Sequence, residues 1–122
     1  MDESPASSER GRVVAALRDA QAASDDLRRE LHANEQATDV LIEGLAQGVP
    51  LEQLLDAINS ERMRPQLTAS LQGYERKRRA ARLRMIALAL EQDMSVEDIQ
   101  QRWAITRSLA VRNIREARGL DS

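Results

Sequence analysis

The side chains best suited to hydrogen-bond chemistry in this 122-residue chain lie near its C-terminus. The stretch "RSLAVRNIREAR", residues 107–118, carries four arginines together with a serine and an asparagine. A guanidinium can donate two hydrogen bonds to O6 and N7 of guanine, and an asparagine amide can bind adenine in the same bidentate way. Arginine also binds phosphate with a planar set of donors. These residue types therefore favour contacts with an anionic, hydrogen-bonding partner.

Two short helices are predicted to position these side chains, over residues 95–118. Ser95 is placed to cap the first helix, and Asp98 stands three residues later, as in a capping box. Thr106 can cap the second helix after a short turn, and Gly119 can end it. The spacing of these caps indicates a helix, a tight turn and a second helix.

This stretch resembles the helix-turn-helix of bacterial transcriptional regulators. Trp103, Ala104 and Ile105 match the apolar, small and apolar residues that span the family's turn, and Thr106 matches its Ser or Thr cap. In that family the second helix enters the major groove of duplex DNA. The resemblance implies base contacts by Arg107, Ser108, Arg112 and Asn113.

The second helix departs from the family pattern in its apolar positions. Val111 and Ile114 fall one residue beyond the usual register, and Ala110 stands where a branched residue is expected. Gln100, in the first helix, replaces a usual alanine. The rotation of the second helix about its axis therefore stays open at this stage.

Basic residues outside these positions are candidates for contacts with the DNA backbone. A cluster in "YERKRRAARLR" either follows the phosphates or is a solvated helix start, where its charge would oppose the helix dipole. That dipole mismatch indicates either an anionic partner or a continuous helix from about Pro65 whose start lies elsewhere. Of phosphate contact and a solvated helix start, we favour phosphate contact. The candidate backbone contacts are Thr106, Arg102, Arg115, Arg118, Arg76, Lys77, Arg78, Arg79 and Arg82.

The N-terminal half of the chain shows a heptad pattern. Small or apolar residues alternate at spacings of four and three, which predicts a long helix over about residues 10–46. Residues 10–47 are interpreted as a dimerisation arm, with packing on the rest of the chain as the alternative, and residues 1–9 are expected to be disordered. The candidate dimerisation residues are Leu17, Leu27, Leu31, Asn34 and Leu41.

The remaining residues, 48–122, are predicted to form a helical DNA-binding domain. Pro65 is expected to open a helix there and Gly73 to end or loosen it. No segment alternates with period two, so the predicted fold class is all-α. The chain has no Phe, so its core must be built from Leu, Ile, Val, Ala and Met.

Composition narrows the function classes. Residues 1–60 hold 12 acidic and 5 basic residues, whereas residues 61–122 hold 8 and 13, which indicates that the second half meets an anion. The chain has no Cys and one His, and we see no catalytic pair, metal site, cofactor motif, small-molecule site or membrane span. We expect a cytoplasmic, nucleoid-associated homodimer that binds double-stranded DNA and is not an enzyme. The alternative is a helical protein–protein adaptor whose basic face meets an acidic partner.

Overall fold

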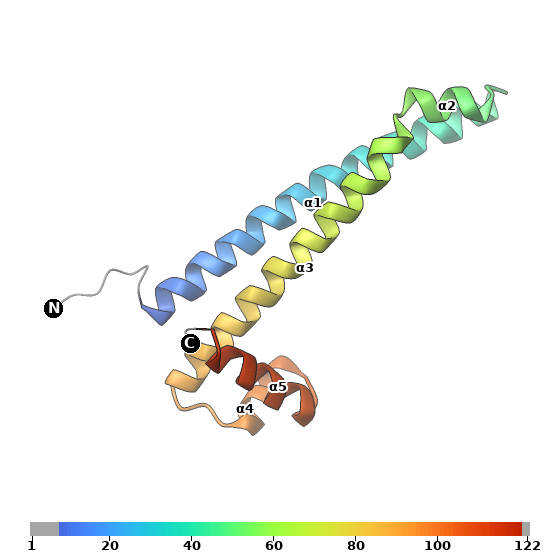
Figure 1. Cartoon of the computed structure of the whole chain (residues 1–122). Coiled ribbons are helices and arrows are strands. Elements are labelled where there is room, and N and C mark those ends of the chain that lie inside the picture. The colour runs from blue at the N-terminus through green and yellow to red at the C-terminus, as the bar shows by residue number, and fades with distance from the viewer. Residues whose placement is uncertain (1–7, 121–122) are drawn as a thin grey trace. The chain divides into compact units, whose positions relative to one another are not determined.

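The computed structural model describes residues 8–120, and the regular structure of these residues is entirely helical (Figure 1). The helices are α1 (Glu9–Ala46), α2 (Leu51–Ala57), α3 (Ser60–Glu91), α4 (Val96–Trp103) and α5 (Arg107–Arg118). The predicted all-α fold is confirmed, and so is the long N-terminal helix.

The start of α1 is explained by a hydrogen bond within its first turn. The hydroxyl of Ser8 accepts a hydrogen bond from the backbone N–H of Gly11 at 3.0 Å, which satisfies one of the free donors at a helix start. The predicted disorder of residues 1–9 is therefore wrong for residues 8 and 9, because this cap orders the first turn. Residues 1–7 lie outside the described residues.

The chain divides into two compact units, each described by itself. The terminal unit comprises residues 8–20 and 76–120, and the middle unit comprises residues 21–75. Both α1 and α3 contribute to each unit. The boundary predicted between residues 47 and 48 falls within the middle unit, in the turn between α1 and α2.

The core of the terminal unit is built from small and branched side chains of three helices. Ile86 and Ile99 are its largest fully buried side chains, and half-buried Trp103 packs against the same cluster. This composition agrees with the prediction of a core without Phe. The buried members are Ile86 and Ala89 of α3, Ile99 of α4, and Ala110, Ile114 and Ala117 of α5.

An ion-pair cluster joins the first turn of α1 to α3 within the terminal unit. Glu9 Oε2 accepts a hydrogen bond from Arg12 Nη1 at 3.1 Å, and Glu9 Oε1 lies 3.9 Å from Arg84 Nη1. The Glu9 side chain is only 8% exposed, so its carboxylate is largely removed from water. The two nearby guanidinium groups offset the cost of burying this charge. Val13, one turn later, is buried in the same region of α1.

In the middle unit, α1 ends in a turn that glycine makes possible. Gly48 has a φ of +83°, a left-handed conformation that glycine adopts without steric cost. The N–H of Val49 then bonds to the carbonyl oxygen of Gly44 at 2.9 Å, which satisfies one of the last carbonyls of the helix. Asn59, with a φ of +57°, makes the corresponding turn between α2 and α3.

The predicted opening of α3 by Pro65 is wrong, and Gly73, which was expected to end or loosen the helix, does not end it. The helix begins at Ser60, so Pro65 lies inside it and does not open it, and Gly73 lies in its interior. Pro65 removes only one backbone donor near the helix start, and its neighbours Arg64 and Gln66 are exposed, so water can reach the backbone there. The helix therefore continues through both residues.

The heptad pattern places a line of small and apolar residues along α1, called the apolar seam below. Only part of this seam is buried against the chain's own helices. In the middle unit, Leu41 lines a hollow of about 360 Å³ together with Leu55 of α2 and Leu67 of α3. This part of the seam packs against the chain's own helices. Among the predicted dimerisation residues, Leu27 and Leu41 are half-buried, whereas Leu17, Leu31 and Asn34 are exposed.

Gly44 provides a test of this packing. A Cβ at residue 44 would lie 2.9 Å from Leu54 Cδ1 and nearer still to Cδ2, and Leu54 is buried. We expect Gly44→Ala to lower the free energy of unfolding by about 1 kcal/mol, because overpacking outweighs the better helix propensity of alanine. In a Leu54→Ala background, where the contacted methyl groups are absent, Gly44→Ala should instead raise the free energy of unfolding. Urea denaturation of the four proteins measures this, and stabilisation by Gly44→Ala alone would contradict the close contact.

Candidate nucleic-acid interface

The two helices predicted over residues 95–118 are present with both of their caps. The Ser95 hydroxyl accepts from the N–H of Asp98 at 3.1 Å, and the Asp98 carboxylate accepts from the N–H of Ser95 at 3.1 Å. This is the predicted capping box. At the start of α5, the Thr106 hydroxyl accepts from the N–H of Leu109 at 3.2 Å.

The turn between α4 and α5 depends on a single left-handed residue. Ala104 has a φ of +52° and ends α4, and its N–H still bonds to Gln101. The next N–H, of Ile105, reaches back to the carbonyl oxygen of Gln100 at 3.1 Å. These bonds close the last turn of α4, so the chain reverses within three residues and α5 begins at Arg107.

Burial determines the rotation of α5. Ala110, Asn113, Ile114 and Ala117 are buried, and this spacing of three and four defines one face of a helix. Ala110, which stands where a branched residue was expected, therefore faces the core. Ile114 faces the core as well, and Val111 is left partly exposed.

The prediction that Asn113 contacts a base is wrong. Its side chain is 3% exposed, and its Nδ2 has no hydrogen-bond partner among the described residues. The sequence pattern is ambiguous at this residue because Asn113 stands beside Ile114, and either could face the core. In the structure both do, so the amide lies on the side of α5 opposite to the arginines.

The outward side of α5 carries Ser108 and Arg112, which were predicted to contact bases, and Arg115, which was predicted to contact the DNA backbone. Ser108, Arg112 and Arg115 follow one another at intervals of four and three, and all three are exposed. They form a stripe along the helix, directly opposite the buried face. Arg107, Arg118 and Arg102 are also exposed, as is Thr106, whose hydroxyl is already used as a cap.

An ion pair links the start of α4 to the start of α5. Arg107 Nη1 donates to Glu97 Oε1 at 3.0 Å, and both side chains are well exposed. Hydrogen bonds from its own backbone N–H and from Arg107 lower the pKa of the Glu97 carboxyl, so it is ionised at neutral pH. No sequence pattern indicated this pair, although both residues stand in the first turns of their helices.

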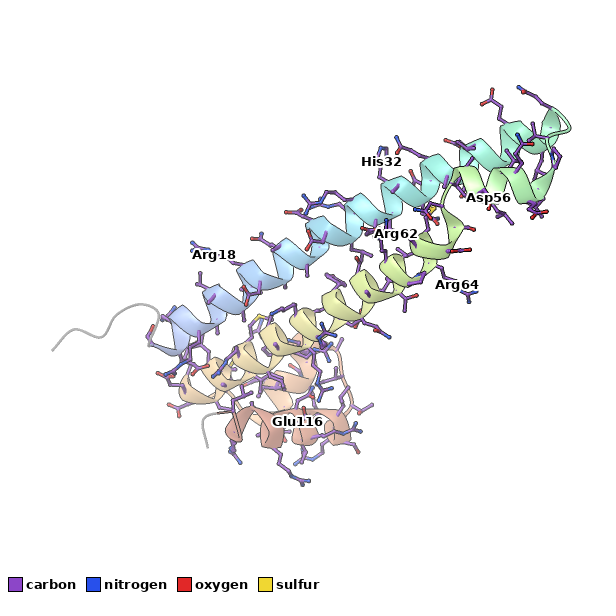
Figure 2. The ribbon with its side chains drawn as sticks, turned by 45° about the horizontal axis from the view of Figure 1, so that its top comes forward. Arg18, His32, Asp56, Arg62, Arg64 and Glu116 are labelled. Atoms are coloured by element: carbon purple, nitrogen blue, oxygen red, sulfur yellow. The ribbon has the colours of Figure 1, made fainter. Side chains whose placement is uncertain are left out.

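The second basic cluster lies in the middle of α3. Residues 76–79 are exposed and Arg82 is half-buried. Because α3 begins at Ser60, the cluster is not a helix start, and the conflict with the helix dipole that the sequence suggested does not arise. Arg79 pairs with Glu116 of α5, which places this part of the cluster beside the last turns of α5 (Figure 2 labels Glu116).

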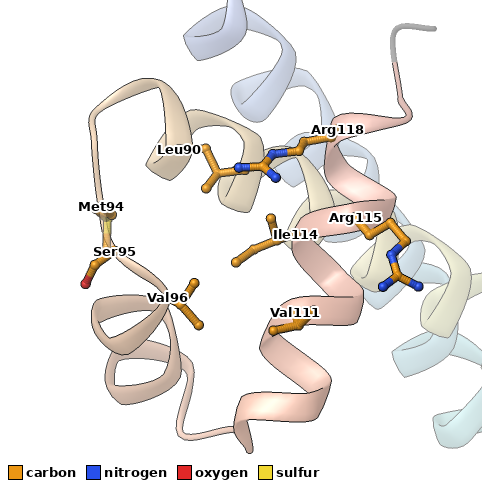
Figure 3. Close-up of a pocket in the computed structure, with 8 residues that line it drawn as sticks. All are labelled: Leu90, Met94, Ser95, Val96, Val111, Ile114, Arg115 and Arg118. Carbon is orange, nitrogen blue, oxygen red and sulfur yellow. The ribbon is translucent and has the colours of Figure 1, made fainter.

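A hollow opens between the start of α4 and the second half of α5 (Figure 3). Its volume is about 480 Å³. Val96 and Val111 lie on opposite sides of it, with Ile114 between them. Arg115 and Arg118 also line it, so an apolar surface borders the basic stripe. No sequence pattern had indicated this hollow, because its walls come from three separate segments.

The comparisons with known proteins give no relative. No protein-family model, curated protein or solved structure matches the chain. Among residues 8–120, no helix combines the length and apolar character needed to cross a membrane. In the same residues, no three His, Asp or Glu side chains form a group that could hold a metal ion.

The burial of Asn113 can be tested by substitution. Replacing it by Val removes a buried amide with an unpaired nitrogen while keeping a similar helix propensity, so we expect the free energy of unfolding to rise by about 1 kcal/mol. Asn113→Asp would bury a charge and should destabilise by several kcal/mol. Thermal and urea denaturation measure both. Equal stability of the Val and Asp variants would place residue 113 at the surface.

Proposed function

We propose that this chain binds double-stranded DNA through α4 and α5 and acts as a dimeric transcriptional regulator. The observation that carries the proposal is the basic stripe of α5, formed by Ser108, Arg112 and Arg115. The helix is fixed to the core by one face, and the opposite face presents Ser108, Arg112 and Arg115. A helix of this kind fits the major groove, where arginine can bind guanine bidentately.

The charge distribution supports the same proposal. The terminal unit holds 14 basic and 7 acidic residues, whereas the middle unit holds 4 and 10. Within residues 8–120, the net charge is therefore +7 in the terminal unit and −6 in the middle unit. A surplus of arginine on the unit that contains α4 and α5 favours binding to phosphates, with counterion release as the driving force.

The start of α5 adds a second kind of contact. Thr106 caps α5, no acidic residue stands in its first turn, and the first N–H groups of a helix attract phosphate. The arginines of α3, from Arg76 to Arg82, can contact the backbone on either side of a binding site. In this arrangement α5 specifies the sequence, and the other groups orient the protein on the duplex.

The exposed apolar side chains of the middle unit favour assembly with another chain. Ile42, Leu45 and Leu51 are each more than half exposed. In the proposed regulator they serve a homodimer, which would place two α5 helices in half-sites about one turn of DNA apart. The same surface would serve the alternative, a protein–protein adaptor that does not bind DNA.

Salt-dependent DNA binding tests the function. The whole chain should bind genomic fragments at low salt, with the logarithm of affinity falling by roughly 0.9 per phosphate contact for each decade of salt. Arg112→Ala and Arg115→Ala should each weaken a selected site by about 1–3 kcal/mol. The controls Arg62→Ala and Arg64→Ala make the same charge change on exposed residues of the middle unit (Figure 2) and should have little effect.

Two results would contradict the proposal. If the chain does not bind duplex DNA at low salt, the adaptor function remains. If the four arginine variants weaken binding equally, the α5 stripe is not the DNA-binding surface. A footprint on the selected site tests the dimer, because two protected half-sites about 10 base pairs apart are expected, and a single protected half-site would indicate a monomer.

The Glu97–Arg107 ion pair gives a separate prediction. A carboxylate beside Arg107 competes with phosphate for the guanidinium, so Glu97→Gln should raise affinity for non-specific DNA and steepen its salt dependence by up to about 0.9. Glu91→Gln makes the same charge change at the end of α3 and should leave the slope unchanged. Titration with random-sequence duplexes at several salt concentrations measures both. An unchanged slope for Glu97→Gln would show that Arg107 does not bind phosphate when released.

A further inference from the structure

Val111 is an apolar residue of α5 that the core leaves exposed. Ala110, Ile114 and Ala117 are buried, but Val111 is 39% exposed. It stands three residues after Ser108 and four before Arg115, so it lies along the edge of the basic stripe. Valine is a poorer helix former than alanine or arginine, so helix formation does not account for an apolar side chain at this exposed residue.

The surroundings of Val111 combine apolar and cationic groups. Val111 forms one wall of the hollow of about 480 Å³, opposite Val96 (Figure 3). Arg115 and Arg118 line the same hollow. A partner that fits here must offer a small apolar group immediately beside hydrogen-bond acceptors or negative charge.

DNA offers this combination at one kind of base. In the major groove the apolar feature of the base edges is the C5 methyl of thymine, and apolar side chains contact it there. A neighbouring guanine presents O6 and N7 to an arginine, and the phosphates carry the negative charge. Valine also presents its two methyl groups in one strongly preferred rotamer within a helix, so its contact surface is fixed before binding.

We propose that Val111 contacts the C5 methyl of a thymine in the target site, next to a guanine bound by Arg112 or Arg115. The inference rests on the proposed DNA binding and adds a specificity-determining residue to it. Val111 supplies discrimination by shape and by exclusion of water from the methyl group. Arg112 or Arg115, on the adjoining stripe, supplies the hydrogen bonds to the guanine.

The experiment removes a single methyl group from the DNA. A site selected with the whole chain is synthesised with each thymine replaced in turn by deoxyuridine, which lacks only the C5 methyl. One thymine in each half-site should prove sensitive, with affinity falling about fourfold per methyl, the equivalent of burying one such group. Replacement in both half-sites should multiply the two losses for a dimer.

Protein variants then assign the effect to a residue. Val111→Ala should bind the thymine and deoxyuridine sites equally, while Val40→Ala, at an exposed valine of the middle unit, should keep the difference. Circular dichroism of each variant confirms its helix content. The deoxyuridine comparison on the unaltered protein does not depend on whether a variant folds.

The outcomes separate this inference from the function on which it rests. If the unaltered chain binds DNA but does not distinguish thymine from deoxyuridine, the thymine contact is wrong and DNA binding stands. If Val111→Ala still distinguishes them, another residue makes the contact. If the unaltered chain binds no DNA, the proposed function fails and the Val111 contact fails with it.

Discussion

The packing of α5 on Ile86 and Ile99 is the constraint on which the candidate site depends. These two side chains are fully buried, and α5 meets them with Ala110, Ile114 and Ala117. Two of the three are alanines, so the backbone of α5 can approach the core closely. With its inner face fixed in this way, the helix has one rotation available, and that rotation determines which arginines point outward.

The interactions that hold the terminal unit together are largely distinct from those that could bind DNA. The buried side chains stabilise the unit, whereas the pairs Glu97–Arg107 and Arg79–Glu116 are between partly or fully exposed groups. Exposed ion pairs contribute roughly 0–1 kcal/mol, so exchanging a carboxylate for a phosphate costs the fold little. In the proposed function, the basic surface would therefore bind and release DNA phosphates without disturbing the core.

The features that the sequence predicted correctly are local ones. The caps by Ser95 and Thr106, the short turn at Ala104 and the long helix α1 each depend on residues within one or two turns of the chain. By contrast, whether Pro65 could lie inside a helix depended on whether the backbone around it stays accessible to water. The burial of Asn113 depended on which other helix faces it, and periodicity alone could not separate it from Ile114.

The seam of α1 shows the same limit on a larger scale. A heptad pattern has two lines of apolar residues, and a sequence cannot show which line meets the chain's own helices. In the middle unit Leu27 and Leu41 are half-buried, while Leu31 and Leu45 are exposed. These pairs belong to the two alternate lines of the heptad, so the chain's own packing uses mainly one of them. A dimer formed through the heptad residues of this part of α1 would use Leu31 and Leu45 beside the exposed Ile42, because Leu27 and Leu41 are already half-buried by the chain's own packing.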